Sequence, residues 1–135
     1  GLKPTLIPIL FEVGANQLAW SNDEVAERFP SIREHVDLPV PLRSAPETWH
    51  GARGRADTLA KWLRERHGAS DGSVCVVGHG NFNQLLIESL LGMSHKDAAW
   101  LHAENCAVHS LLITPDEGKF LKSNDVSHIP EHERS

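Results

Sequence analysis

A single histidine stands between two glycines directly after an apolar run. The run is Ser73–Val77 and the turn is Gly78–Asn81. A short apolar run is typical of a parallel strand covered on both faces, and residues 82–91 follow with the periodicity of a helix. His79 is therefore expected at the carboxyl end of a strand, beside the free N–H groups that begin a helix. Such a place attracts anions, so His79, Gly80 and Asn81 form a predicted phosphate site.

Other motifs built on a glycine turn do not fit this stretch. A nucleophile elbow requires Gly-x-Ser-x-Gly, and Gly80 stands where the serine belongs. A dinucleotide fingerprint requires a third glycine where Asn83 stands, and the chain has no Gly-Lys-Ser or Gly-Lys-Thr. The alternative explanation of His79 is a solvated histidine in a turn.

Two further groups are candidates for chemistry. Glu12 follows the strand-like residues 5–11, where a carboxylate can act as a general acid, although most such glutamates are simply solvated. Arg53 and Arg55 could reach a phosphate from the start of a helix, with ordinary ion pairs as the alternative. The triplet Arg66-His67-Gly68 is a known catalytic motif, but helical periodicity precedes it, so we interpret it as a helix end.

Length and charge limit the classes of partner. The 135 residues fit one domain, and the net charge of −5 without a basic block argues against nucleic acid or an anionic membrane. No apolar run is long enough to span a membrane, and no signal segment opens the chain, so we expect a cytoplasmic protein. The two cysteines and nine histidines show no metal-ligand spacing, and Cys75 is predicted to be a small buried side chain.

Alternating strand and helix patterns predict an α/β sandwich. The expected strands are residues 5–11, 73–77 and 107–113, with Phe120-Leu121 as a returning hairpin arm. The expected helices are residues 23–29, 47–67 capped by Gly68, 82–91 and 94–101, and residues 31–46 form a long loop.

Several segments resemble the histidine phosphatase superfamily, the phosphoglycerate mutase-like proteins. Val74–Phe82 resembles the second histidine motif of that family, and Leu90-Leu91-Gly92 is similar to the end of the helix that follows it. Weaker similarities lie at residues 12–14, 22–30, 105–111 and 124–130.

The resemblance implies a three-layer α/β sandwich with a mostly parallel sheet flanked by helices. It also implies a phosphomonoesterase that acts on a small phosphorylated metabolite through a phosphohistidine, without metal or cofactor. His79 would stabilise the transferring phosphoryl group, and Glu12 would protonate the leaving oxygen. A phosphoglycerate mutase-type phosphotransferase is an equally compatible variant.

The sequence departs from the family pattern in one respect. A nucleophilic Arg-His-Gly turn on a first strand should precede Glu12, and the residues before it hold none. We therefore expect residues 1–135 to be a single partial domain that lacks the N-terminal part and is inactive alone. A non-catalytic α/β module and an unrelated Rossmann-like domain are the alternatives. Loss of the first strand would leave Ser73–Val77 as an exposed sheet edge, available for a homodimer or for the missing segment.

Overall fold

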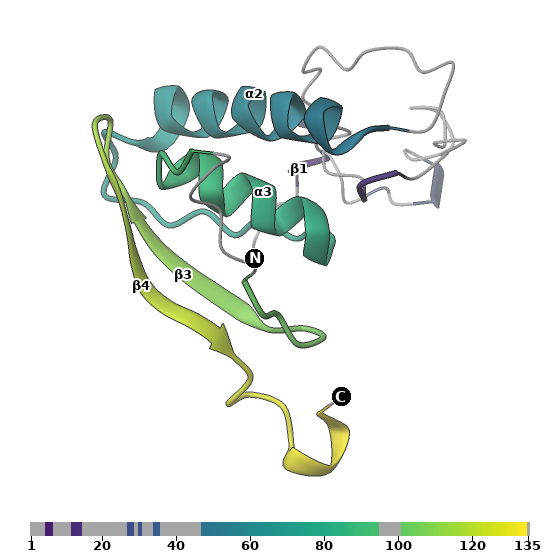
Figure 1. The fold of residues 1–135 in the computed structure, drawn as a ribbon. Coiled ribbons are helices and arrows are strands. Elements are labelled where there is room, and N and C mark those ends of the chain that lie inside the picture. The colour runs from purple at the N-terminus through teal and green to yellow at the C-terminus, as the bar shows by residue number, and fades with distance from the viewer. Residues whose placement is uncertain are drawn as a thin grey trace.

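The structure is a computed structural model that describes residues 5–6, 12–14, 27–28, 30, 34–35, 47–94 and 101–134. Two helices, α2 (Trp49–His67) and α3 (Gly80–Leu90), lie side by side, and an antiparallel hairpin extends beside them (Figure 1). The hairpin consists of β3 (Val108–Ile113) and β4 (Gly118–Asp125), and a short 3-10 helix, η2 (Glu131–Glu133), follows it. The fold therefore contains both helices and strands, as the sequence predicts.

The long helix α2 confirms the prediction for residues 47–67. Thr48 is its N-cap, and the Thr48 hydroxyl accepts a hydrogen bond from the Gly51 N–H at 3.1 Å. Gly68 occupies the C-cap position with a φ of −63°, so the glycine is not needed for a left-handed turn. A Cβ there would lie 2.6 Å from the Arg64 carbonyl oxygen and 3.2 Å from the Pro115 nitrogen. The Arg64 carbonyl of α2 and the close approach of the hairpin turn together favour glycine at this position.

The second helix, α3, begins two residues earlier than the predicted helix over residues 82–91. It ends at Leu90 with Leu91 as its C-cap, and Gly92 follows with a φ of +68°, the left-handed conformation that favours glycine. The Met93 N–H then bonds the Glu88 carbonyl at 2.9 Å, which satisfies one of the last free carbonyls of the helix.

The packed core lies between α2 and α3. Small residues recur every four positions along α2, and this spacing allows the larger side chains of α3 to approach closely. Phe82 is fully buried in this contact. The buried cluster comprises Ala52, Ala56, Leu59, Ala60 and Leu63 of α2 with Phe82, Leu85, Leu86 and Leu90 of α3. Val76 and two residues of β3, Leu111 and Ile113, pack against it.

The hairpin confirms the predicted strand over residues 107–113 and the returning arm at Phe120-Leu121. Strands β3 and β4 pair antiparallel, with Leu111 opposite Phe120 and Ile113 opposite Gly118. The turn closes through the Thr114 N–H, which bonds the Glu117 carbonyl at 2.9 Å.

The prediction that Ser73–Val77 forms a central strand of a sheet is wrong. Within the described part of the chain, Ser73–Val77 belongs to neither two-stranded sheet, and a strand exists only where a neighbour pairs with it. Cys75, predicted to be buried, is exposed for the same reason. The predicted loop over residues 31–46 contains β2 (Glu34–His35), which pairs parallel with β1 (Thr5–Leu6).

The three-layer sandwich with a mostly parallel sheet is not confirmed in the described part of the chain, where the sheets have two strands each. Residues 27–28 are helical, within the helix predicted over 23–29. The rest of that helix, residues 7–11 of the first strand and residues 95–100 of the last helix lie outside the described residues.

Neither described helix combines the length and the apolar character that crossing a bilayer requires.

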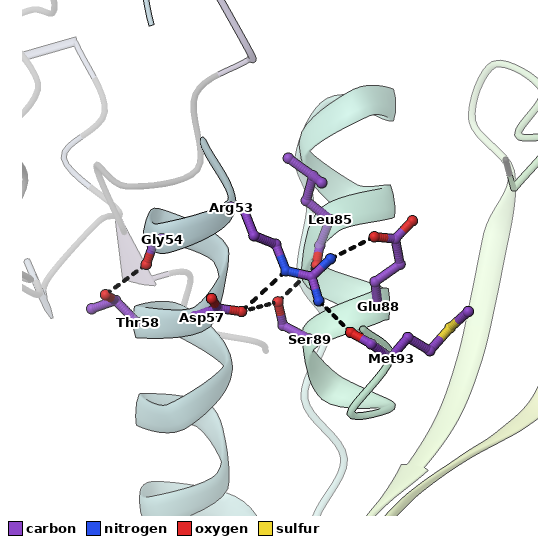
Figure 2. A network of polar contacts seen from close by, with 8 residues as sticks. All are labelled: Arg53, Gly54, Asp57, Thr58, Leu85, Glu88, Ser89 and Met93. Carbon is purple, nitrogen blue, oxygen red and sulfur yellow. Dashed lines mark hydrogen bonds and ion pairs between the residues drawn. The ribbon is translucent and has the colours of Figure 1, made fainter. Parts of the chain in front are cut away.

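A buried ion pair joins the two helices (Figure 2). A guanidinium nitrogen of Arg53 lies 2.6 Å from a carboxylate oxygen of Glu88, and both side chains are at most 6 % exposed. Arg53 also donates to the Met93 carbonyl at 2.6 Å and to Asp57 at 3.3 Å. Gln84 donates to the other Glu88 oxygen at 2.9 Å. In the described residues no buried side-chain polar atom lacks a hydrogen bond, as a buried charge requires.

A second arginine fixes the hairpin to the helices. The Arg64 guanidinium donates to the carbonyls of Thr114 and Glu117 in the hairpin turn, and to the carbonyl of Leu90 at the end of α3. This side chain of α2 therefore binds three backbone carbonyls, two in the hairpin turn and one at the end of α3. A Cβ on Gly118 would collide with the same Leu90 carbonyl, at 2.2 Å. The hairpin turn therefore packs so closely on the end of α3 that residue 118 cannot carry a side chain without a shift of the backbone.

His109 links the two strands near a register shift. Its Nδ1 accepts a hydrogen bond from the Asn124 N–H at 3.3 Å and lies 3.2 Å from the Ser123 hydroxyl. The Phe120 ring is 6.5 Å from the imidazole, centre to centre. Burial lowers the pKa of His109 below its ordinary value of 6.5, and the accepted N–H bond requires the neutral ring.

Removing one partner of the buried ion pair should destabilise the fold strongly. Arg53→Met leaves Glu88 charged and buried, so we expect the free energy of unfolding to fall by about 3–5 kcal/mol. The double variant Arg53→Met/Glu88→Leu should recover most of that loss. Denaturant unfolding followed by circular dichroism measures both values. The matched control is Lys61→Met, which removes an exposed pair with Glu65 and should cost at most about 1 kcal/mol. Equal losses in Arg53→Met and Lys61→Met would contradict the assignment.

Acidification should destabilise the hairpin through His109. The folded pKa lies below the unfolded value, so the unfolded chain binds the proton more readily. The contribution of this residue is complete above pH 6.5 and is lost progressively as the pH falls below that value. Thermal unfolding of the wild type and of His109→Gln, compared across this range, isolates the effect. The difference in melting temperature between the two should change on acidification, and a constant difference would refute it.

Candidate active site

His79 lies where the sequence predicts, at the start of α3. It is the N-cap residue, with an extended backbone (φ −99°, ψ 153°), and its carbonyl accepts the first helical bond from the Asn83 N–H at 2.7 Å. Its side chain makes no capping hydrogen bond and is exposed. The imidazole is therefore available to a ligand at this end of the helix.

Glu12 is brought to the same helix end. One of its carboxylate oxygens, Oε1, accepts from the Val13 N–H at 2.6 Å and from the Phe82 N–H at 3.2 Å. The Phe82 N–H is one of the free donors of the first turn of α3, so the carboxylate caps a helix seventy residues away in the sequence. The other oxygen, Oε2, has no hydrogen bond from the described residues. Glu12 and the His79 turn thus share one helix terminus.

The first turn of α3 also retains open donors. Gly80 is exposed, and a Cβ added to it would meet no atom within 4 Å. The N–H groups of Gly80 and Asn81 are free by position, since a helix leaves its first donors without intrahelical partners. Glu12 takes the Phe82 donor, which leaves two predicted phosphate-binding N–H groups beside a histidine and a carboxylate. This set can bind an oxyanion and can give or accept a proton.

Arg55 supports this helix end from α2. Its guanidinium carbon lies 3.9 Å from the centre of the Phe82 ring. The same guanidinium pairs with the Glu47 carboxylate through contacts of 3.1 and 2.6 Å, and both side chains are almost fully buried. Phe82 thus bonds Glu12 through its N–H and contacts Arg55 through its ring. Arg53 and Arg55 both form ion pairs within the fold, which is the alternative to phosphate binding that the sequence analysis gave for them.

The triplet Arg66-His67-Gly68 is a helix end, as the sequence analysis predicts. His67 is the last residue of α2 and its ring packs edge-on against Trp62 at 5.9 Å. The Arg66 guanidinium lies 5.5 Å from the same indole. The last turn of α2 lies beside the end of α3, where Arg64 bonds the Leu90 carbonyl, so the triplet does not supply a catalytic histidine turn at the first turn of α3.

The described residues contain no cluster of three or more His, Cys, Asp or Glu side chains that could hold a metal ion. A shallow groove lies at the other end of the helices from His79. It is lined by Asp57, Ala60, Lys61, Arg64, Glu65, Ser89 and Pro115. Arg64 is already bonded to three carbonyls, so the groove is not a second candidate for the phosphate site.

A comparison with protein families tests the resemblance. The family model of the histidine phosphatase superfamily (branch 1) matches residues 2–126, most of the chain. The chain belongs to the histidine phosphatase superfamily. No curated protein and no solved structure matches it. Membership supports a phosphatase or mutase type of protein with an α/β fold.

The sequence analysis missed two residues that shape this end of the fold, Glu47 and Phe82. Glu47 stands outside α2 and pairs with a residue eight positions away, so no helical spacing signals the contact. Phe82 looks like an ordinary core residue, and only its buried ring and its N–H bond reveal that it joins three elements.

The proximity of Glu12 to the open donors can be tested on the chain as it stands. A carboxylate beside an anion site repels the anion, so Glu12→Gln should bind phosphate or vanadate about fivefold tighter, on the order of 1 kcal/mol. Isothermal titration calorimetry measures the affinities. Glu117→Gln, an exposed carboxylate in the hairpin turn, is the control and should not alter binding. Weaker binding in Glu12→Gln than in the wild type would contradict the placement.

Proposed function

We propose that the complete domain is a phosphohydrolase that cleaves a small phosphorylated metabolite through a phosphohistidine intermediate. The observation that carries the proposal is the meeting of His79 and Glu12 at the first turn of α3 in a member of this superfamily. The complete domain would be a three-layer sandwich in the cytoplasm. A phosphoglycerate mutase-type transfer uses the same groups and differs only in the final acceptor.

His79 would act on the phosphoryl group as it moves. A protonated imidazole together with the N–H groups of Gly80 and Asn81 presents positive charge and donors to the phosphoryl oxygens. These groups stabilise charge and do not form the covalent bond. Because the N-cap conformation fixes the His79 backbone, the imidazole works from a position held by α3.

Glu12 would act as the general acid and base. When the nucleophilic histidine attacks phosphorus, the bond to the substrate oxygen breaks, and protonated Glu12 gives its proton to that oxygen. Water then attacks phosphorus, the phosphorus–nitrogen bond breaks, and the carboxylate takes the proton from water. The two hydrogen bonds to Oε1 would hold the group in place while Oε2 carries the proton.

The described site does not include the nucleophilic histidine that the proposed reaction requires. The one Arg-His-Gly triplet within these residues ends α2. Residues 1–135 alone are therefore proposed to bind phosphate without turning over a substrate. A non-catalytic α/β module is the second candidate, and it is favoured by the use of Arg53, Arg55 and Arg64 in contacts within the fold.

The decisive variant is His79→Ala in a polypeptide that includes the nucleophilic turn. We expect the rate of hydrolysis of a generic aryl phosphate to fall at least about a hundredfold, because a main source of transition-state stabilisation is lost. His67→Gln is the matched control, since it alters the other histidine of a glycine-containing motif and should leave the rate unchanged. An unaltered rate in His79→Ala would refute the role. On residues 1–135 alone, absence of saturable phosphate binding would favour the non-catalytic module.

A further inference from the structure

Glu12 is tied to α3 through one residue, Phe82. Oε1 of Glu12 accepts the Phe82 N–H at 3.2 Å. The same oxygen also accepts the Val13 N–H at 2.6 Å, but Val13 is the next residue in the chain and moves with Glu12. Among the hydrogen bonds of the described residues, the one from Phe82 therefore places the carboxylate at the helix end where His79 stands.

The first turn of α3 has little stability of its own. Helix ends fray, Gly80 is a poor helix former, and the N-cap His79 makes no side-chain capping bond. This turn also contains no acidic residue that would complement the helix dipole. Contacts from other elements must therefore maintain the direction in which the Phe82 N–H points.

The Phe82 ring is held by Arg55 of α2. The guanidinium carbon lies 3.9 Å from the ring centre, the ring is fully buried, and the Arg55 side chain is 1 % exposed. The attraction between a cation and an aromatic face is stronger where water is excluded. Because fraying of the first turn would pull the ring away from this contact, Arg55 also restrains the Phe82 backbone.

Glu47 orients the Arg55 guanidinium. Nε donates to one carboxylate oxygen at 3.1 Å and Nη2 donates to the other at 2.6 Å. A fork of two hydrogen bonds fixes the plane of the guanidinium as well as its position. Glu47 directly precedes Thr48, the N-cap of α2, so the pair joins the beginnings of both helices.

We propose that Arg55, oriented by Glu47, is a positioning residue for the general acid. Through the Phe82 ring it holds the Phe82 N–H toward Glu12, so that the carboxylate stays where it can give its proton to the leaving oxygen. The inference rests on the proposed function, in which Glu12 is that acid. Arg55 acts on the reaction only through Phe82 and Glu12, so its loss should impair proton delivery more than phosphoryl binding.

Arg53 provides a matched comparison on the same helix. It also forms a buried ion pair with a carboxylate, at 2.6 Å, and also joins α2 to α3. Its hydrogen bonds go to Asp57, Glu88 and Met93, none of which belongs to the first turn of α3 (Figure 2). The same substitution at the two arginines therefore separates the loss of a buried pair from the loss of positioning.

Substrates with different leaving groups test the inference in a polypeptide that includes the nucleophilic turn. Para-nitrophenyl phosphate releases a stable phenolate that needs little protonation, whereas glycerol phosphate releases an alkoxide that must be protonated as its bond breaks. We expect Arg55→Met to lower kcat/KM for glycerol phosphate about tenfold more than for para-nitrophenyl phosphate. Arg55→Lys keeps the cation but not the fork, so it should fold and show the same selectivity to a smaller extent. Arg53→Lys should leave the ratio of the two kcat/KM values unchanged.

Amide hydrogen exchange, followed by nuclear magnetic resonance, tests the same contact in residues 1–135 without turnover. An N–H in the first turn of a helix exchanges through local fraying, whereas one in the middle exchanges through a larger opening. Arg55→Lys should therefore raise the exchange rate of the Phe82 amide relative to that of Leu86. Arg53→Lys should lower the overall stability and leave this ratio unchanged.

The Glu12→Gln variant separates failure of this inference from failure of the proposed function. If Glu12→Gln impairs glycerol phosphate selectively but both Arg55 variants impair the two substrates equally, Arg55 does not position the acid. An equal change of the exchange ratio in Arg55→Lys and Arg53→Lys would likewise overturn the inference. Equal impairment of both substrates in Glu12→Gln would instead refute the general acid, and the inference with it.

Discussion

The buried ion pair between Arg53 and Glu88 is the constraint on which the described fold depends. Two charges withdrawn from water are tolerated only when every donor and acceptor around them is satisfied, and Gln84, Asp57 and the Met93 carbonyl complete that set. Asp57 lies on α2, Gln84 lies on α3, and Met93 lies on the chain that leaves α3; Figure 2 shows Asp57 and Met93 around the Arg53 guanidinium. Because the Arg53 and Glu88 charges must meet with these partners in place, the ion pair favours one register of α2 against α3.

That register determines what stands at the two ends of α3. At its end, the Leu90 carbonyl meets Arg64, which also holds the hairpin turn. At its beginning, the Phe82 ring lies beneath Arg55 while the Phe82 N–H faces Glu12. The site is therefore not an independent loop. His79 and Glu12 are positioned by contacts at this helix end and by the Arg53–Glu88 pair farther along α3, and Arg53, Arg55 and Arg64 all make contacts within the fold.

The sequence was sufficient to predict elements that depend on contacts between neighbouring residues. The helix over residues 47–67, the helix after His79 and the strand at residues 107–113 depend on periodicity, caps and a turn, all of which neighbouring residues encode. The prediction of a sheet strand at Ser73–Val77 was wrong because pairing depends on two strands, and the apolar composition of one segment does not reveal its partner. The prediction that Cys75 is buried was wrong for the same reason. The placement of His79 followed from the glycine turn, whereas the bond between Glu12 and Phe82 is a long-range contact without a local signal.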